Sequence, residues 1–558
     1  MSDRIRFVAL GGLDEIGKDV YLIEINDDIF VFESGVKYAD KTTPGVDFII
    51  ANYRYLVENK HRVKAYFISH GHSDQFGALP YMIKDAPAPI YCSAITKLMI
   101  QEFCALKKLS DKSFDYRVVA PSSNHVVGGR DVVFFQTVHS VPKSFGVGIS
   151  TSEGYIVYSS DFVIDYNSSN SYKTDLNALA RIAEKGTYIL ISESIFALRG
   201  GYTTPKHRLT PHLEKAVRDL EGRLYIAAYY SDIYRLQEIV NFILKNKKKV
   251  AFFDNETRQL VRALNTEGEL VLPSQQTIDY EDIVRVKKEE LVVLVVGDGE
   301  GLFNKVNSIV DSNNTLSHFK VESKDTFILA TPSASNLERM MTDTIDNLYR
   351  TDAKIVYFGR SDISGMHASQ EDLKMLLSLL KPKFYIPVKG EFRHLLANAQ
   401  IAIGMGIGLN HSSVFVLDNG DGVELSGNVS KMLHGYIPAG EILIDGLGVG
   451  DVETVVINDR QKLSDDGVII MALAVSLSQK KIITEPDIQM RGFIFVRDGE
   501  HIIKKLQHLF ITEVEVSLNN NVVDFHETRS LIEEIAAKKV WRDTGRNPMI
   551  ICLVEVME

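Results

Sequence analysis

The sequence is poor in cysteine and has no long apolar run. Only three of its 558 residues are cysteines, and Cys92, Cys104 and Cys552 are far apart. An odd, scattered set predicts neither a disulfide framework nor a Cys-x-x-Cys metal clamp, which favours a reducing compartment. No window reaches the roughly 18 apolar residues of a membrane-spanning helix, and the charged start of the chain does not resemble a signal peptide. We therefore expect a cytoplasmic protein without a membrane segment.

An excess of basic residues is also lacking. The chain has 62 Lys and Arg against 73 Asp and Glu, so its formal net charge is −11. A protein that wraps nucleic acid over its whole surface needs excess positive charge, so that class is disfavoured, although a local basic groove remains compatible. Hydrophobic residues make up 45% of the chain, which is enough to build several folded domains at this length.

Short apolar runs that end in polar clusters dominate the first 200 residues. They are predicted to be core strands with polar loops at their carboxyl ends, and the helical patterns at 78–84 and 94–106 between them indicate an α/β class. The predicted strands are 4–10, 19–25, 63–69, 132–137, 155–159 and 188–191.

A second alternation of strands and helices begins near residue 206. The run 223–229 predicts a strand, Ser231 is the predicted N-cap, and 233–244 has apolar residues at helical spacing. A helix near 334–349 continues the pattern, which predicts an inserted α/β domain. The end of the chain is predicted to be a small α+β unit.

The strongest chemical signal is a loop directly after a predicted strand, which contains His70, His72 and Asp74. His139 and Asp161 follow two further strands. A single histidine or aspartate in such a place is usually an ordinary hydrogen-bonding loop residue. Several of them at the carboxyl ends of strands converge at one edge of a sheet, and nitrogen and oxygen ligands together suit zinc.

These residues resemble the metallo-β-lactamase fold, and the insertion points to its β-CASP nucleic-acid-processing branch. Within that branch the sequence is similar to bacterial ribonuclease J over essentially the whole chain. The matching stretches are 10–17, 139–144, 160–162, 367–374, 381–391 and 444–452. We therefore expect an α/β fold with a metallo-β-lactamase αββα sandwich, an inserted α/β β-CASP domain and a small α+β C-terminal domain.

The resemblance also implies domain bounds. The expected division is 1–205 for the first part of the metallo-β-lactamase domain, 206–354 for the β-CASP domain, 355–440 for the second part, 441–455 for a linker, and 456–558 for a C-terminal dimerisation domain.

The resemblance implies a two-metal ribonuclease that shortens RNA from its 5′ end and also cuts internally. One zinc ion would be held by His70, His72 and His139, and a second by Asp74 and two further histidines, with Asp161 bridging. Mg²⁺ or Mn²⁺ are alternative ions. Such ions lower the pKa of a shared water and neutralise the scissile phosphate.

Two positions of the second metal site depart from the family pattern, because Gln75 and Lys389 stand where histidines are expected. Glutamine is a poor zinc ligand, and lysine must lose its proton before it binds a metal. At about 4 Å a lysine charge would repel a divalent ion by roughly 2–8 kcal/mol, so we expect this site to be weak or absent. Alternatively, the Lys389 ammonium takes the place of the second ion and binds phosphate, in which case RNA binding survives while hydrolysis weakens.

Further roles follow from the resemblance alone. Asp74, Glu193 and His367 are the expected catalytic residues, with Glu193 replacing an aspartate and His367 as the general acid, displaced by one residue through Met366. Asp232 places an acid where the family has an asparagine at a helix start. The expected contacts to RNA phosphates are Ser231, Asp232, Ile233, Ser364, Gly365, Met366 and His367.

Such losses are typical of the second ribonuclease J paralogue of Gram-positive bacteria. Our leading hypothesis is a weak 5′–3′ exonuclease and endonuclease in rRNA maturation and mRNA decay. The alternative is a non-catalytic RNA-binding or scaffolding subunit, whereas a small-molecule hydrolase would leave the insertion without a purpose. The expected partners are RNA, an intact ribonuclease J paralogue, a second copy of the chain and an RNA-degrading complex. Trp541 is predicted either to anchor an interface or to pack in a local core.

Overall fold

The computed structural model describes residues 2–39, 43–166, 170–218, 220–311, 319–332, 337–446, 448–449, 454–493, 496–519 and 525–557. The chain divides into two compact units. Unit 1 comprises Met1–Lys37 and Ile50–Glu441, and unit 2 comprises Tyr38–Ile49 and Ile442–Glu558.

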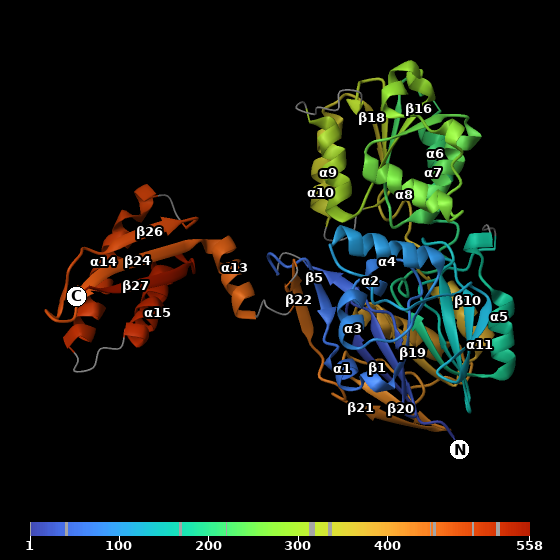
Figure 1. Ribbon diagram of the computed structural model, residues 1–558, viewed down its shortest axis with the longest axis horizontal. Helices are drawn as coiled ribbons and strands as arrows, with labels where there is room; N and C mark the ends of the chain where they lie inside the picture. Colours follow the sequence, from blue (N-terminus) through green and yellow to red (C-terminus); the bar gives the residue numbers. More distant parts are fainter. Residues whose placement is uncertain are drawn as a thin grey trace. The chain divides into compact units, whose positions relative to one another are not determined.

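Two sheets stacked face to face form the centre of unit 1 (Figure 1). The first has the order β21-β20-β1-β2-β3-β6-β7-β8, and the second has the order β19-β13-β12-β11-β10-β9. Their inner faces share one hydrophobic core, in which Phe67 of the first sheet meets Phe134 of the second with ring centroids 5.9 Å apart. The strands of the first sheet are β1 Ile5–Gly11, β2 Val20–Ile25, β3 Asp28–Phe32, β6 Val63–Phe67, β7 Ile90–Cys92, β8 Tyr116–Val118, β20 Gly422–Ser426 and β21 Val429–Leu433. Those of the second are β9 Ser123–Val127, β10 Arg130–Gln136, β11 Phe145–Thr151, β12 Gly154–Tyr158, β13 Thr187–Glu193 and β19 Phe384–Val388.

Helices cover the outer faces of both sheets. On the second sheet, α5, α11 and α12 share a core with β10, β12, β13 and β19, while α4 packs against β8 of the first sheet. Ser93 caps α4 by accepting a hydrogen bond from the Thr96 N–H, and Ile95, Met99 and Phe103 are its buried positions. This layering confirms the predicted αββα sandwich. The helices are α1 Arg54–Glu58, η1 Lys60–Arg62, α2 Ser73–Phe76, α3 Leu79–Asp85, α4 Ala94–Leu106, η2 Asn170–Tyr172, α5 Leu176–Lys185, α11 Gln370–Leu380 and α12 Phe392–Gly404.

The insertion in unit 1 is a parallel five-stranded sheet with the order β15-β16-β14-β17-β18. Helices α9 and α10 lie on one side of this sheet, and α6 and α7 lie on the other (Figure 1). Its strands are β14 Leu224–Tyr229, β15 Lys249–Phe252, β16 Leu291–Gly297, β17 Thr326–Leu329 and β18 Lys354–Tyr357. Its helices are α6 Thr210–Ala216, α7 Ile233–Lys245, α8 Asn255–Thr266, η3 Ser274–Gln276, η4 Tyr280–Arg285, η5 Lys288–Glu290, α9 Gly299–Val310 and α10 Glu338–Tyr349.

Two predicted details of the insertion differ from the structure. Ser231 is not the N-cap of α7, because the Asp232 carboxylate accepts the Arg235 N–H and caps the helix instead. A carboxylate also interacts more favourably than a hydroxyl with the positive end of a helix. The helix predicted near 334–349 begins at Glu338, and residues 333–336 lie outside the described residues.

In unit 2, α14 and α15 pack on a sheet in which β24 pairs with β25, β26 and β27. Trp541 on α15 is 63% exposed, so the prediction that it packs in a local core is wrong. The elements are α13 Thr454–Asp466, β24 Val468–Ser476, β25 Lys481–Ile482, β26 Asp487–Arg491, α14 Val496–Asn519, α15 Phe525–Thr544 and β27 Met549–Met557. A small sheet has the order β23-β22-β5-β4, with β4 Val36–Tyr38, β5 Phe48–Ala51, β22 Glu441–Asp445 and β23 Gly448–Val449.

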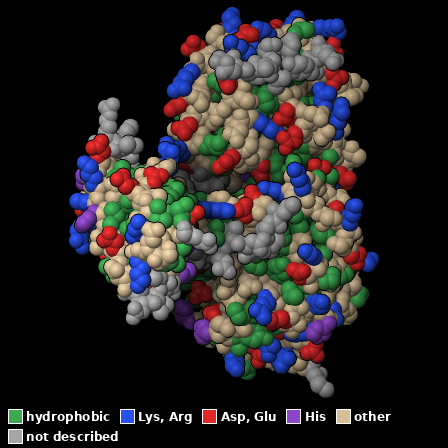
Figure 2. Space-filling view, turned by 60° about the vertical axis from the view of Figure 1, so that its left-hand side comes forward, with side chains coloured by type: hydrophobic (Ala, Val, Ile, Leu, Met, Phe, Trp, Pro, Cys, Tyr) green, Lys and Arg blue, Asp and Glu red, His purple; other side chains and the backbone are tan. Residues whose placement is uncertain are grey.

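Charges of both signs are interspersed over the face of the molecule drawn in Figure 2. Among the described residues, no helix combines the length and the apolar character needed to cross a bilayer.

Candidate functional site

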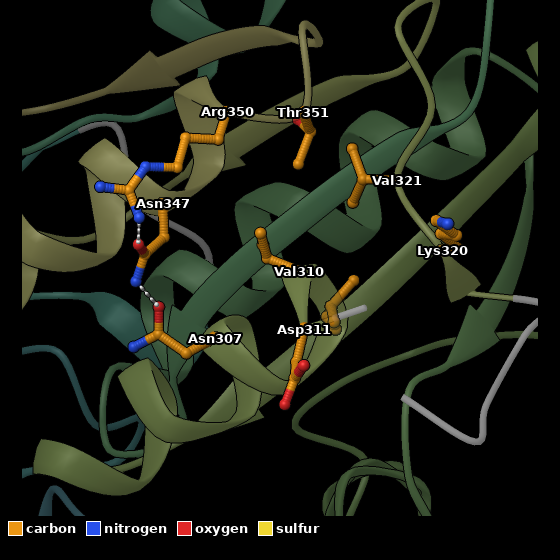
Figure 3. Close-up of a pocket in the computed structure, with 9 residues that line it drawn as sticks. Asn307, Val310, Asp311, Lys320, Val321, Asn347, Arg350 and Thr351 are labelled. Atoms are coloured by element: carbon orange, nitrogen blue, oxygen red, sulfur yellow. Dashed lines mark hydrogen bonds between the residues drawn. The ribbon is translucent and has the colours of Figure 1, made fainter. Parts of the chain in front are cut away.

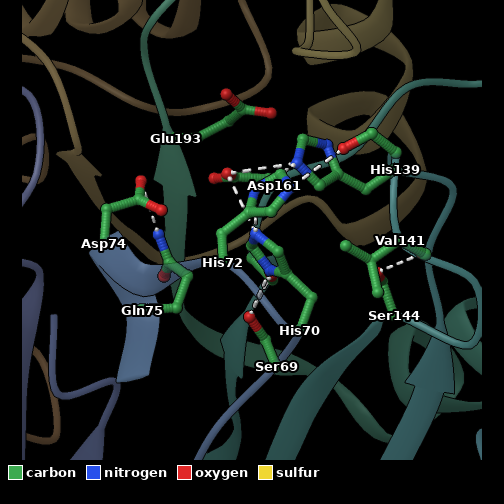
Figure 4. A network of polar contacts seen from close by, with 12 residues as sticks. Ser69, His70, His72, Asp74, Gln75, His139, Val141, Ser144, Asp161 and Glu193 are labelled. Atoms are coloured by element: carbon green, nitrogen blue, oxygen red, sulfur yellow. Dashed lines mark hydrogen bonds and ion pairs between the residues drawn. The ribbon is translucent and has the colours of Figure 1, made fainter. Parts of the chain in front are cut away.

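Three imidazoles converge at one edge of the sandwich (Figure 4). His70 and His72 lie in the loop between β6 and α2, and His139 follows β10. The Nδ1 atom of His72 is 3.2 Å from Nε2 of His70 and 3.3 Å from Nε2 of His139. Ligands about 2.05 Å from a tetrahedral zinc ion are about 3.3 Å apart. Two of the three separations match this value, and all three nitrogens lie within 4.8 Å of one another, so they could hold one metal ion.

The other ring nitrogen of each histidine has its own partner. Nδ1 of His70 lies 2.9 Å from the Ser69 hydroxyl, and Nδ1 of His139 donates to the Met366 carbonyl at 2.7 Å. Burial holds the pKa of His70 and His139 well below the usual value, so these rings are neutral. Neutral rings held in this way present a lone pair to the centre of the cluster.

His72 reaches across to the inserted domain. Its Nε2 donates to the backbone carbonyl of Ser231 at 3.1 Å, and the Ser231 hydroxyl donates to Asp298 at 3.3 Å. Asp298 immediately precedes α9. A candidate metal ligand is thus oriented by a group from the insertion, and this contact joins the two domains of unit 1.

Asp161, which follows β12, lies beside the histidine cluster. Its Oδ2 is 3.6 Å from Nε2 of His70 and 3.7 Å from Nε2 of His139. Its Oδ1 is buried and has no hydrogen-bond partner among the described residues. An unpaired buried carboxylate oxygen is costly, so this atom is suited to a ligand that comes from outside the protein. Asp161 and the three imidazoles fit a bound metal.

Lys389 fills the position beside this cluster where a second metal is expected. It follows β19, is 1% exposed, and has a φ angle of 57°. Its Nζ lies 2.6 Å from Asp161, 3.0 Å from Asp74 and 3.2 Å from Asp19, in each case from Oδ2. One ammonium group therefore forms ion pairs with three carboxylates that would otherwise repel one another.

The pKa values of the four groups reflect the different distances between the ammonium and the three carboxylates. Burial alone would lower the pKa of Lys389, but the three carboxylates outweigh burial and raise it well above its usual value. Burial alone would raise the pKa of Asp161 and Asp74, but Lys389 outweighs it and lowers both. Burial dominates at Asp19, the carboxylate furthest from the ammonium, and raises its pKa to about 7.

Gln75 supports the same carboxylates. Its Nε2 donates to Asp19 at 2.7 Å. It also donates to Asp74 at 3.2 Å (Figure 4). Both residues at the altered metal positions, Gln75 and Lys389, therefore donate hydrogen bonds to oxygens that a second ion would need as ligands. The sequence did not single out Asp19, although an acidic residue directly before the fully buried strand β2 was a signal for it.

His367 points into the site, and the loop accommodates Met366 by burying it. Nδ1 of His367 is 2.7 Å from Glu193, and its ring centroid is 5.2 Å from that of His139. Glu193 also accepts the backbone N–H groups of Phe162 and Ala368. Burial alone would lower the pKa of His367, but Glu193 outweighs it and raises the pKa. A protonated imidazole held by a fixed carboxylate is a suitable general acid.

Two residues just before His367 face different surroundings. Ser364 is buried, and its hydroxyl has no hydrogen-bond partner among the described residues, whereas Gly365 is exposed. At the start of α7, the Asp232 carboxylate pairs with Arg235 at 2.9 Å, and Ile233 is buried. The structure therefore brings Ser231, Met366 and His367 to the histidine cluster, while the acid of Asp232 is directed to its own helix.

A cavity of about 720 Å³ lies apart from these residues, between α9 and α10 of the insertion (Figure 3). Asn347 donates to Asn307 at 3.2 Å, and Arg350 donates to Asn347 at 3.0 Å. The described residues that line the cavity include neither a histidine nor a cluster of carboxylates. We therefore place the chemistry at the imidazoles, where the ligand atoms converge.

The sandwich, the inserted parallel sheet and the imidazole cluster together define a protein of the metallo-β-lactamase fold with a β-CASP insertion. Two family models match the chain: the β-CASP domain of ribonuclease J over residues 221–333, and the ribonuclease J C-terminal domain over residues 455–556. Ribonuclease J 2 of Staphylococcus epidermidis is 30% identical over 99% of this chain and 98% of its own length, and Ribonuclease J 2 of Staphylococcus aureus strain MRSA252 has the same identity and coverage. The chain belongs to the ribonuclease J family.

A solved structure shares the fold. A protein of unknown function from Enterococcus faecalis V583 superimposes with a TM-score of 0.51 and 15% identity, covering 76% of this chain and all of its own.

Proposed function

We propose that this chain is a ribonuclease with one metal ion on His70, His72 and His139, and with Lys389 in place of the second ion. Zinc is the ion that the ligand set suits best, with Mg²⁺ or Mn²⁺ as alternatives. The expected activity is weak 5′–3′ exonucleolytic cleavage with some internal cutting. The observation that carries the proposal is the set of three ion pairs made by the buried Lys389 ammonium.

The reduced rate has a simple electrostatic basis. Lys389 donates hydrogen bonds to Asp161 and Asp74 and forms an ion pair with Asp19. The ammonium therefore acts on a phosphate mainly through its charge. A single positive charge among three carboxylates leaves less positive potential than a divalent ion would. The phosphate is therefore bound and polarised less strongly than in a two-metal site.

The remaining chemistry falls to residues of the chain. A metal on the three imidazoles, when bound, supplies Lewis acidity to water and to a phosphate oxygen. His367 holds the proton that the leaving oxygen needs, and Glu193 keeps the ring oriented and protonated. Asp161 lies between the imidazoles and Lys389 and so links the two halves of the site.

The test compares the wild type with His139→Ala and with the double variant Gln75→His/Lys389→His on a 5′-monophosphorylated single-stranded RNA. We expect His139→Ala to abolish the weak exonuclease activity, and we expect the double variant to exceed the wild type. If His139→Ala digests RNA as fast as the wild type, the site is not catalytic. The non-catalytic RNA-binding or scaffolding subunit would then be the better description.

We further propose that the chain works in the cytoplasm in rRNA maturation and mRNA decay, beside an intact ribonuclease J paralogue in an RNA-degrading complex. The weak site and the 30% identity to two proteins named Ribonuclease J 2 support this role. The family-model matches fit inside or next to the expected bounds of 206–354 for the β-CASP domain and 456–558 for the C-terminal dimerisation domain. Activity measured alone and in an equimolar mixture with the paralogue tests the partnership, and purely additive rates would contradict it.

A further inference from the structure

An aromatic ring and a guanidinium group are stacked beside His367, in the loop that follows β13. The Cζ atom of Arg199 lies 3.5 Å from the ring centroid of Phe196, a distance that places the guanidinium on the face of the ring. The same ring meets the imidazole of His367 edge to face, with centroids 5.3 Å apart. The stack therefore begins at the candidate general acid and extends outward to Arg199.

The outer side of this stack is open. Arg199 is exposed, and a Cβ atom added to either Gly200 or Gly201, the next two residues, would have nothing within 4 Å. The Phe196 ring fixes one face of the guanidinium, so the opposite face is free for a second planar group. Arginine held flat in this way is a common platform for an unpaired base.

The charge of Arg199 is not compensated. Among the described residues it forms no ion pair, and burial together with the charge of Arg360 lowers its pKa. Arg360 itself lies 3.6 Å from Glu338, with both side chains about half exposed. An anion that binds to both guanidinium groups would reduce their mutual repulsion.

We propose that Phe196, Arg199 and Arg360 form a binding site for one nucleotide of single-stranded RNA next to His367. The base stacks on the free face of Arg199, and the adjoining phosphate binds to the guanidinium groups of Arg199 and Arg360. This assignment rests on the proposed function as a ribonuclease. It adds a specificity element, because a base in a duplex is already stacked on its neighbours and cannot use the platform.

The experiment measures the anisotropy of a fluorescein-labelled, ten-nucleotide single-stranded RNA as a function of salt, in EDTA so that no cleavage occurs. We expect Arg199→Gln to weaken binding about tenfold, since it removes both a stacking surface and a charge. Arg199→Gln and Arg360→Gln should each lower the slope of log affinity against log salt by about 0.7, the value for one phosphate contact of a single strand.

Phe196→Leu separates stacking from charge. It removes the support of the guanidinium without altering any charge, so affinity should fall while the salt slope stays at the wild-type value. Arg339→Gln is the matched control, because Arg339 is 86% exposed on α10 of the insertion and should change neither quantity. The same RNA annealed to its complement should show a smaller difference between the wild type and Phe196→Leu.

The outcomes distinguish this site from the general function. If the wild type binds the RNA while Arg199→Gln and Arg360→Gln match its affinity and its salt slope, the site is refuted and the ribonuclease proposal stands. If the wild type does not bind RNA at all, both fail. Circular dichroism of each variant establishes that a lost affinity is not a loss of fold.

Discussion

Lys389 is the residue that most distinguishes the proposed chemistry of this chain from that of a two-metal site. A fully buried ammonium is stable only when carboxylates repay its lost hydration, and here Asp161, Asp74 and Asp19 all lie within 3.2 Å of its Nζ atom. The same arrangement makes the lysine necessary to the fold. His367 lies 3.8 Å from Asp161, but Lys389 is the cation that lies close to all three acids.

Lys389→Met should therefore be strongly destabilising unless a metal is present. Removing one partner of a buried charge network costs about 3–5 kcal/mol, because the remaining charges stay buried and uncompensated. We expect a large fall in melting temperature in EDTA that zinc partly restores, since the freed carboxylates can then bind an ion. The exposed Lys60 provides the control variant Lys60→Met. A melting temperature equal to that of the wild type in EDTA would contradict the account.

At the residue scale, the sequence predicted which residues form the site better than it predicted the contacts between them. The positions of His70, His72, His139 and Asp161 at strand ends predicted the cluster that the structure shows. The contact of Asp19 with Lys389 could not be predicted, because it joins residues 370 positions apart in the chain through the pairing of different strands. The orientation of His367 likewise depends on how a loop folds around one additional residue, which no periodicity reveals.

At the scale of elements, the inserted domain contacts the candidate metal site through the residue that precedes α9. The chain of contacts runs from His72 through Ser231 to Asp298. Outer partners of this kind fix the ring orientation of a ligand, and their loss typically weakens metal binding 10- to 100-fold.

Asp298→Ala should accordingly weaken zinc binding by about tenfold. Its carboxylate holds the Ser231 hydroxyl, so the carbonyl that orients His72 would lose its position. Competition with a chromophoric chelator measures the zinc affinity directly, without an activity assay. Asp346→Ala, an exposed position on α10 of the same domain, is the control. Equal zinc affinities for Asp298→Ala and the wild type would show that the contacts from Asp298 through Ser231 to His72 do not contribute to zinc binding.

The segment that precedes β1 makes another charged contact, through Asp3. Asp3 accepts hydrogen bonds from Arg130 at 3.0 and 3.1 Å and from the Ser152 N–H at 2.9 Å. The hydrogen bond from Arg130 is the main cause that lowers the pKa of Asp3. A carboxyl pKa that is lower in the folded state stabilises the protein above the unfolded pKa of about 3.9, and this contribution is lost as the pH falls below it.

Asp3→Asn should thus lower the free energy of unfolding by about 1 kcal/mol at pH 7. The difference from the wild type should shrink as the pH falls below about 4, where the wild-type carboxyl starts to lose its advantage. Urea denaturation at pH 7, 4.5 and 3.5 measures this difference. A difference that is the same at all three pH values would mean that the ionised form of Asp3 is not the stabilising species.

At the scale of the whole molecule, alternating patterns predicted the α/β class and the insertion, whereas the αββα layers were expected from the resemblance to a known family. The inclusion of Tyr38–Ile49 in unit 2 was not predictable, because that segment joins residues about 400 positions later in the chain. The net charge of −11 bears on binding of RNA over the whole surface, but not on binding at a local site. It disfavours general electrostatic wrapping of RNA, whereas the proposed contacts at His367, Arg199 and Arg360 are local.

Trp541 offers a direct test of self-association. It is the single tryptophan of the chain and is 63% exposed on α15, so its emission reports on that surface alone. If it anchors an interface, its emission maximum should move to shorter wavelength as protein concentration rises. Trp541→Ser should then sediment as a smaller species than the wild type at equal concentration. An emission maximum that stays constant across a range in which dimers form would place the interface elsewhere.

The central claim is that one buried ammonium replaces one metal ion. The most direct test is a count of zinc per chain, in which metal-stripped wild-type protein is titrated with zinc, desalted and analysed by mass spectrometry of the element. The account predicts one tightly bound zinc per chain. Two tightly bound zinc ions per wild-type chain would contradict it.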